Sequence, residues 1–279
     1  MSIKRILVPV ETADAGAAAL LAAIRIAADF GATVEALHIR DRPQVPPSEY
    51  YPLGALVSEE FLKALEAAAV GKAARLRQMV DETLSAARSL GASPSARWIE
   101  HEGASPADIG AAARVADLAV FGRTNEAGKI RESANLEEVL FHAGRPVIIA
   151  PAGAFASPAR RILLAWNGSR EAARAMAAAM PFFERADAVG VVSFGAPGPG
   201  LASAEEAAAT LRLHGATTEV IRRDREDRDA DEFLDLARSW RADLAVMGAY
   251  SHARWRQIVL GGFTRKMLAA ADLPVLMAH

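Results

Sequence analysis

"KRILVPVETADAGAAAL" at residues 4–20 returns later in the chain as "RRILLAWNGSREAARAM" at residues 160–176. Each stretch has a basic pair, a short run of leucine and β-branched residues, a polar turn and an alanine-rich helical pattern. Two further matches follow in the same order: "ADLAVFGRT" (116–124) with "ADLAVMGAY" (242–250), and "RPVIIAP" (145–151) with "LPVLMAH" (273–279). Three matches in one order indicate an internal duplication.

Each copy predicts an alternation of five strands with helices. In the second copy we expect strands at 161–166, 188–194, 218–222, 244–247 and 274–277, all short apolar runs without alternation. Such runs are typical of parallel strands covered by helices on both faces. The sequence therefore predicts an α/β protein of two tandem doubly wound, Rossmann-like domains, at residues 1–150 and 160–279. Each would hold a five-stranded parallel sheet, with ligands at the carboxyl ends of the strands.

The first copy carries an insertion at about residues 41–75. Four prolines (Pro43, Pro46, Pro47 and Pro52) exclude regular structure at its start, and Ser58 resembles a helix start. Apolar residues then recur at helical spacing beyond Gly71, which predicts two helices or one interrupted helix. The segment either covers one face of the sheet or, with Tyr50 and Tyr51, forms a lid over a pocket.

Composition limits the classes of partner. The chain has 279 residues, of which 52% are hydrophobic, and its net charge of -2 comes from well-mixed acidic and basic residues. This balance offers no broad field for nucleic acid or an anionic membrane. The absence of cysteine excludes disulfides and thiolate chemistry, and no apolar run approaches the ~20 residues of a membrane span. We expect a cytoplasmic protein with no nucleic-acid or membrane partner.

One candidate loop follows the strand at 161–166. Asn167 and Gly168 make a turn, Ser169 is suited to cap the following helix, and Glu171 lies where the helix dipole favours an acid. Asn167 either completes this turn or hydrogen-bonds a ribose or base. Trp166 either fills the interior or stacks on adenine.

The other candidate loop is "MGAYSHARWRQIVLGGFTRK" at residues 247–266. Gly248 ends a strand, and Gly261 and Gly262 precede Thr264 at the start of the last helix. Exposed N–H groups and the positive end of the dipole make such a junction suitable for a phosphate. Arginines at 254, 256 and 265 add positive charge, and His252 is either a further donor or a solvated loop residue.

Other kinds of site are poorly supported. No Walker loop occurs, and the prolines of "GAPGPG" (195–200) lack the N–H groups of a phosphate cradle, so we interpret it as a turn. The six histidines are scattered, and "EHEG" (100–103) reads as a polar strand end rather than a metal site. No catalytic dyad or metal site is predicted.

Together, these residues resemble the universal stress protein family in its tandem two-domain form. Its nucleotide-binding members carry a glycine, two residues, a glycine, nine residues, then glycine and serine or threonine. Gly248 and Gly261 match, whereas Ser251 replaces the second glycine and Gly262 the hydroxyl residue. Asn167 stands where the family usually has a nucleotide-contacting aspartate.

The resemblance implies a regulatory or protective protein that binds ATP, with Mg²⁺ only alongside the nucleotide, in the second domain and without efficient turnover. The expected binding residues are Ala165, Trp166, Asn167, Gly248, Ser251, His252, Arg254, Gly261, Gly262, Phe263 and Thr264. The resemblance also implies an internal pseudo-dimer through the last strands, and leaves a larger homo-oligomer open. The alternatives are a scaffold whose pocket is collapsed or repurposed, and slow ATP hydrolysis.

The first copy departs further from the motif. Glu11 takes the aspartate position, and Ser133 and Ala134 fall where Gly261 and Gly262 lie in the second copy. Its loop also carries Glu132 and Glu137, acids that repel a triphosphate. We expect no tight ATP binding in the first copy.

Overall fold

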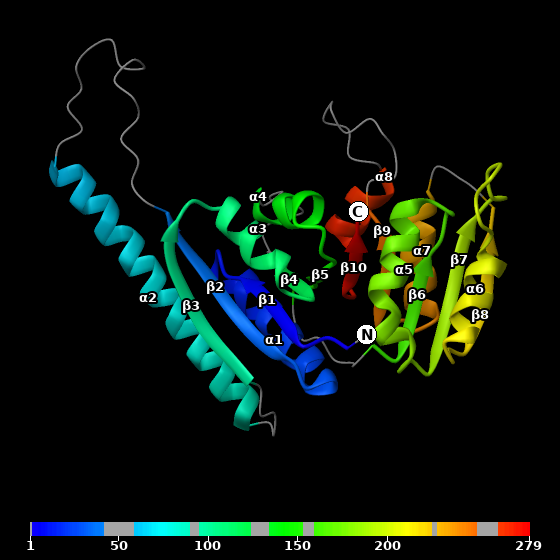
Figure 1. Ribbon diagram of the computed structural model, residues 1–279, viewed down its shortest axis with the longest axis horizontal. Helices are drawn as coiled ribbons and strands as arrows, with labels where there is room; N and C mark the ends of the chain where they lie inside the picture. Colours follow the sequence, from blue (N-terminus) through cyan, green and yellow to red (C-terminus); the bar gives the residue numbers. More distant parts are fainter. Residues whose placement is uncertain are drawn as a thin grey trace, which may run out of the picture.

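The computed structural model of the chain describes residues 2–41, 59–89, 95–123, 134–152, 159–224, 228–249 and 262–279 (Figure 1). The first half contains β1 (Arg5–Pro9), α1 (Ala13–Phe30), β2 (Thr33–Asp41), α2 (Glu59–Ser89), β3 (Ser95–Gly103), α3 (Ala107–Arg114), β4 (Leu118–Gly122), α4 (Ala134–Glu137), the π-helix η2 (Glu138–His142) and β5 (Val147–Ala150). The second half contains β6 (Arg161–Ala165), α5 (Arg170–Phe183), β7 (Ala188–Phe194), α6 (Ala204–Leu213), β8 (Thr218–Arg223), α7 (Asp229–Ser239), β9 (Leu244–Gly248), α8 (Gly262–Ala270) and β10 (Val275–Ala278). The predicted alternation of strand and helix in two tandem units is confirmed.

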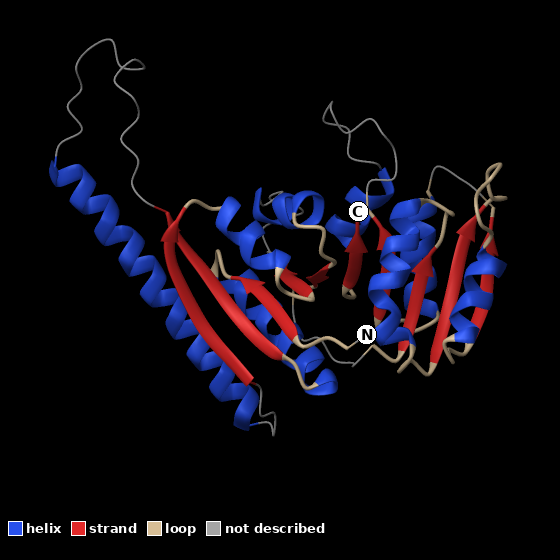
Figure 2. Cartoon of the chain, viewed as in Figure 1, coloured by secondary structure: helices blue, strands red, loops and turns tan. Residues whose placement is uncertain are grey.

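The ten strands form one mixed sheet in the order β3-β2-β1-β4-β5-β10-β9-β6-β7-β8. Within each half all neighbouring strands are parallel. The last strands of the two halves, β5 and β10, pair antiparallel, with Ile148 opposite Leu276. The two five-stranded sheets are therefore continuous through this one antiparallel pair (Figure 2).

Helices cover both faces of the sheet, which explains the continuous apolar strand runs. One core cluster joins the strands to α1, α2, α5 and α6. The other joins them to α3, α7, α8 and the segment of α4 and η2. Successive residues of one strand pack in the two different core clusters, as Leu163 and Leu164 of β6 do. Among the described residues, no helix is long and apolar enough to cross a bilayer.

The structure also refines the predicted elements. Strand β7 has the predicted bounds, and the other strands of the second half differ by one residue at one or both ends. The insertion contributes to a single helix, because α2 runs without a break through Gly71 to Ser89. The prediction of two helices or one interrupted helix was wrong. The proline segment, Ser58 and residues 153–158 of the linker lie outside the described residues.

Candidate functional site

The predicted site of the second half lies where the strand order reverses. Strand β6 has β7 on one side and β9 on the other, and Ala165 of β6 pairs with Met247 of β9. The next residues along these strands, Trp166 and Gly248, therefore follow neighbouring strand ends. Helix α8 comes after β9 at this end of the sheet (Figure 1). In open α/β sheets this switch in strand order is where ligands bind.

The turn after β6 is held by its own side chains. Asn167 Oδ1 accepts a hydrogen bond from the backbone N–H of Ser169 at 3.0 Å, and Gly168 adopts a left-handed conformation with φ of 73°. Ser169 Oγ accepts from the N–H of Ala172 at 3.2 Å, so the predicted helix cap is confirmed. Asn167 is exposed at the strand end while its side-chain oxygen is used in the turn.

Glu171 lies at the start of α5 and is 2% exposed. Burial raises the pKa of its carboxyl, but hydrogen bonds from Arg170, from its own backbone N–H and from Ser169, with the charge of Arg170, outweigh burial. The pKa is therefore held below its ordinary value. Arg170 Nε lies 2.7 Å from Glu171 Oε1 and is the charged partner of this acid. A buried carboxylate thus lies beside the predicted site.

Trp166 fills the interior. It is 6% exposed, packs in the core cluster shared with α5 and α6, and donates from Nε1 to the carbonyl oxygen of Ala202 at 2.9 Å. A buried indole whose N–H is bonded has a complete structural role. Of the two predicted roles, filling matches this geometry.

Gly248 is required by close helix packing. A Cβ added at Gly248 would lie 2.5 Å from the backbone nitrogen of Ala172 in α5. The equivalent Gly122 of β4 packs against α1 in the same way, because an added Cβ there would clash with the carbonyl oxygen of Ala15. The first motif glycine therefore has a packing role in both halves, whatever binds nearby.

Helix α8 is described from the exposed Gly262 onward, and no described residue lies within 4 Å of a Cβ added there. No acidic residue lies in its first turn. Phe263 packs edge-on against Phe194 and Phe233, with ring centroids 6.4 and 5.7 Å away. Thr264 is 5% exposed. The start of the helix is thus open on the Gly262 side and closed by aromatic packing on the other.

The remaining predicted site residues lie outside the described part of the chain. These are Ser251, His252, Arg254 and Gly261. Arg256, named with them as a source of charge, and Glu132 and Ser133 of the first copy also lie there. Ala165, Trp166, Asn167, Gly248, Gly262, Phe263 and Thr264 are described, and the sheet and α8 place them at one end of the second half.

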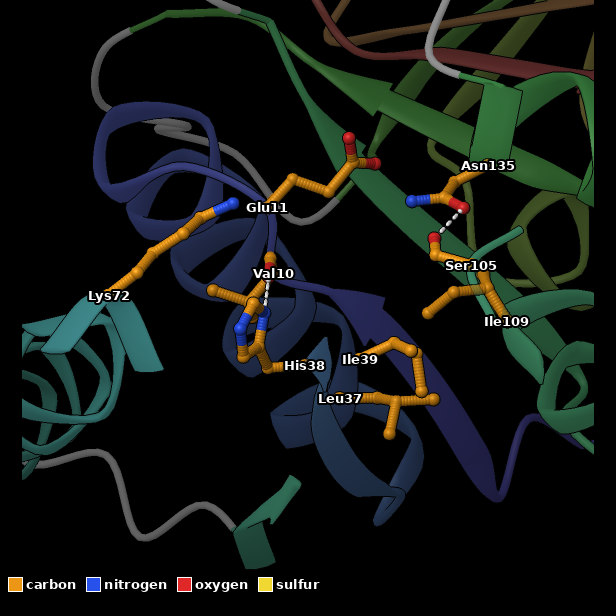
Figure 3. A pocket seen from close by; sticks show the side chains of 9 residues that line it. All are labelled: Val10, Glu11, Leu37, His38, Ile39, Lys72, Ser105, Ile109 and Asn135. Carbon is orange, nitrogen blue, oxygen red and sulfur yellow. Dashed lines mark hydrogen bonds between the residues drawn. The ribbon is translucent and has the colours of Figure 1, made fainter. Parts of the chain in front are cut away.

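The first half contains a pocket at its own strand ends, which sequence reasoning did not identify (Figure 3). Its volume is about 90 Å³, below the ~300 Å³ at which ligand pockets usually begin. Its lining comes from β2, from α2, α3 and α4, and from the loops after β1 and β3: Val10, Glu11, Leu37, His38, Ile39, Lys72, Ser105, Ile109 and Asn135. No local motif marks this pocket, because its lining residues come from segments that lie far apart in the sequence.

Polar side chains of this pocket are held by neighbouring groups. Ser105 Oγ donates to Asn135 Oδ1 at 2.5 Å, and Asn135 is 7% exposed. Figure 3 shows the amide nitrogen of Asn135 on the side of Glu11. The buried His38 places Nδ1 2.8 Å from the carbonyl oxygen of Val10. The pocket is small, polar on one side and apolar on the other.

Acids elsewhere on the sheet lie in ion pairs. The "EHEG" segment is the carboxyl end of β3, as predicted, and Arg40 lies 3.4 Å from Glu100 Oε1 and 3.6 Å from Glu102 Oε2. The described residues contain no group of three metal-ligating side chains.

Comparisons with known proteins agree with this architecture. The universal stress protein family matches residues 2–151 and again residues 158–279. A universal stress protein from Archaeoglobus fulgidus DSM 4304 superposes with a TM-score of 0.71 at 15% identity, covering 99% of this chain and 96% of that one. A protein of unknown function from Pseudomonas aeruginosa PAO1 gives a TM-score of 0.57 at 16% identity, covering 99% of this chain and 92% of that one.

No curated protein matches the chain in sequence. At these identities the solved structures support the fold, while the family matches extend over both halves of the chain. The chain therefore belongs to the universal stress protein family and carries two tandem domains of it.

Proposed function

We propose that the chain is a regulatory or protective stress protein that binds ATP in its second half. The phosphates lie at the start of α8, and the nucleoside lies over the ends of β6 and β9. Mg²⁺ accompanies the nucleotide, and turnover is slow or absent. The protein acts in the cytoplasm. The observation that carries the proposal is the open start of α8 beside the switch in strand order.

The electrostatics of α8 suit an anion. Its first four N–H groups have no partners within the helix, and the dipole gives that end a partial positive charge. No acid lies in the first turn, and the exposed Arg265 adds a positive charge there. Gly262 leaves space for close approach on the side of the described residues, none of which lies within 4 Å of an added Cβ. These residues fit a phosphate group.

The proposal is tested by calorimetric titration of the full chain with ATP and Mg²⁺. Gly262→Asp adds a side chain with a carboxylate at the start of α8, where no described residue lies within 4 Å of the new Cβ. This change leaves the fold intact, because an acid at a helix start is favourable, but it repels phosphate. We expect at least a tenfold loss of affinity. Gly262→Ala keeps the N–H groups and adds only a neutral methyl, so it should lose less affinity than Gly262→Asp.

The matched control lies in the first half. Ala134 is the exposed first residue of α4 and occupies the position equivalent to Gly262. Ala134→Asp should leave ATP affinity unchanged if binding is confined to the second half. If the heat of ATP binding disappeared in Ala134→Asp and persisted in Gly262→Asp, the binding site would lie in the first half. No heat in the parent at millimolar ATP would reject the proposal.

A scaffold without nucleotide is the second candidate function. It is favoured by the internal roles of Trp166 and Asn167, whose side chains hold the Ala202 segment and the turn after β6. In that case both halves of the fold serve protein association, and calorimetry shows no heat with ATP for any variant.

A further inference from the structure

The carboxyl end of α8 is held by a side chain of the first half. Arg123, the residue after β4, donates from Nη1 to the carbonyl oxygen of Ala271 and from Nη2 to that of Met267. Its backbone N–H donates to the carbonyl oxygen of Ala150 at 2.9 Å, which fixes Arg123 to the end of β5. The residue is therefore anchored in one half and bonded to the other, so a shift of α8 against the first half would break these bonds.

The guanidinium of Arg123 lies where water replaces these bonds poorly. The residue is partly buried, and burial lowers its pKa, although the charge of Asp272 opposes this effect. Its Nε is buried and has no hydrogen-bond partner in the described part of the chain. Because a buried charged group is costly unless it is bonded, the two carbonyl bonds strongly favour one position of α8.

A second contact from the first half reaches the end of β9. His279 places Nδ1 3.0 Å from the carbonyl oxygen of Ala249, the buried residue that follows Gly248. The ring of His279 packs edge-on against Phe141 of η2, with ring centroids 4.8 Å apart. The strand end over which the nucleoside is proposed to lie is therefore packed, through His279, against the first half.

These contacts are not repeated in the opposite direction. The duplicated segments align Arg123 with Ala249, and His279 with Pro151. Alanine has no side-chain donor, and proline has no donor at all. The second half therefore cannot make the equivalent hydrogen bonds from these positions. The half that departs further from the nucleotide motif supports the other half, and not the reverse.

Helix α8 connects the Arg123 contact to the proposed phosphate site. Its nine residues span about 14 Å, with Gly262 at the amino end and the bonded carbonyl oxygens toward the carboxyl end. Phosphate binding at a helix start requires backbone N–H groups in a fixed place. The charge of Arg123 at the carboxyl end also favours the helix dipole, whose positive end would face the phosphate.

We propose that Arg123 is a positioning residue for nucleotide binding: its bonds to the carboxyl end of α8 fix the amino end of that helix, where the phosphates bind. Phe141 has the same role at the end of β9, through His279. The first half thereby sets the affinity of the second. This inference rests on the proposed function for its ligand, whereas the hold of Arg123 on α8 requires no ligand.

Amide hydrogen exchange of the free full chain tests the hold on α8. Arg123→Met removes both carbonyl bonds and should speed exchange in peptides covering residues 262–271 about tenfold or more, without a similar rise in α5. Arg145→Met is the matched control, because it removes bonds to the carbonyl oxygen of Arg114 within the first half, and should leave α8 unchanged. Unchanged exchange of α8 in Arg123→Met, or an equal rise in α5, would overturn the proposal.

Calorimetric titration with ATP and Mg²⁺ tests the link to binding. Arg123→Met should bind about tenfold more weakly than the parent, and Arg123→Lys, which keeps the charge and a donor, should recover part of the loss. Phe141→Ala should also weaken binding. Val115→Ala should not, because Val115 is 61% exposed and lies before the opposite end of β4. Circular dichroism should show the same helix content in every variant.

The outcomes separate this proposal from the proposed function. If the parent gives no heat at millimolar ATP, the nucleotide function fails and the binding role of Arg123 fails with it, while faster exchange of α8 would still support its hold on the helix. If the parent binds ATP and Arg123→Met binds equally well, the nucleotide function stands and the positioning role is rejected. A loss of stability without a loss of affinity would likewise make Arg123 purely structural.

Discussion

Arg123 of the first half donates a hydrogen bond from Nη2 to the carbonyl oxygen of Met267 in the second half at 3.2 Å. Its Nη1 also donates to the carbonyl oxygen of Ala271, just after α8. A cation is favourable at the carboxyl end of a helix, where the dipole is negative. Burial lowers the pKa of Arg123, although the charge of Asp272 opposes this effect. One side chain therefore links the end of β4 to the end of α8.

Arg123→Met should destabilise the protein by about 1.5–3 kcal/mol, the range for hydrogen bonds to a charged group. Urea unfolding followed by circular dichroism measures this loss. Arg145→Met is the control: Arg145 is partly buried and donates at 3.1 and 2.8 Å to the carbonyl oxygen of Arg114 within the first half. Equal losses of unfolding free energy in the two variants would show that the contact of Arg123 between the halves adds no stability beyond that of a bond within one half.

Two substitutions at Trp166 separate packing from hydrogen bonding. Trp166→Phe keeps most of the buried ring but loses the bond to Ala202, and should cost about 0.5–1.5 kcal/mol. Trp166→Ala leaves a cavity and should cost about 3–5 kcal/mol. Thermal unfolding distinguishes these costs. If the indole were instead a surface for a bound base, Trp166→Ala would weaken ATP binding and leave the stability of the free protein nearly unchanged.

The two glycines at described positions of the nucleotide motif, Gly248 and Gly262, should respond differently to substitution by alanine. Gly248→Ala forces a methyl to 2.5 Å from the backbone nitrogen of Ala172, and should cost about 1–3 kcal/mol. The methyl of Gly262→Ala meets no described residue within 4 Å and lies at the start of a helix, so this variant should be neutral or slightly stabilising. Chemical unfolding of both variants checks this. A tolerated Gly248→Ala would mean that packing of α5 does not require the glycine.

Much of the fold could be predicted from the sequence because the physical signals were local. The strands are buried on both faces, so each appears as an apolar run, and Ser169 appears as a helix cap in its immediate context. Gly71 was misleading because a glycine lowers helix stability by only about 1 kcal/mol. The surrounding alanines favour the helix, and a Cβ at Gly71 would meet nothing closer than Arg75 Nη1 at 3.5 Å.

The candidate site was harder to predict because it depends on distant contacts. Nothing near Gly248 in the sequence shows that α5 packs against it. The pocket of the first half brings His38 and Ser105 together with Asn135, and the partner of Asn135 lies 30 residues away in sequence. From the sequence, each of these residues could be assigned to a strand end or a helix start. Their arrangement around one cavity could not be predicted.

A buried carboxylate predicts how stability changes with pH. Glu35 of β2 is 4% exposed and lies between Arg5 of β1, 2.7 Å away, and Arg97 of β3, 2.6 Å away. Burial raises the pKa of Glu35, but the hydrogen bonds and charges of both arginines outweigh it and lower the pKa below its ordinary value. The folded protein therefore binds this proton less readily than the unfolded chain does.

The sign of the effect follows from that difference. The contribution of Glu35 to the free energy of unfolding is present above its unfolded pKa of about 4.3, and it is lost as the pH falls through the folded pKa. Glu35→Gln should cost about 1–3 kcal/mol at pH 7, and this cost should shrink as the pH falls below about 4. Urea unfolding at a series of pH values measures it, with the exposed Glu184→Gln as control. A cost for Glu35→Gln that stays constant from pH 7 to pH 3 would show that ionisation of Glu35 does not contribute to stability.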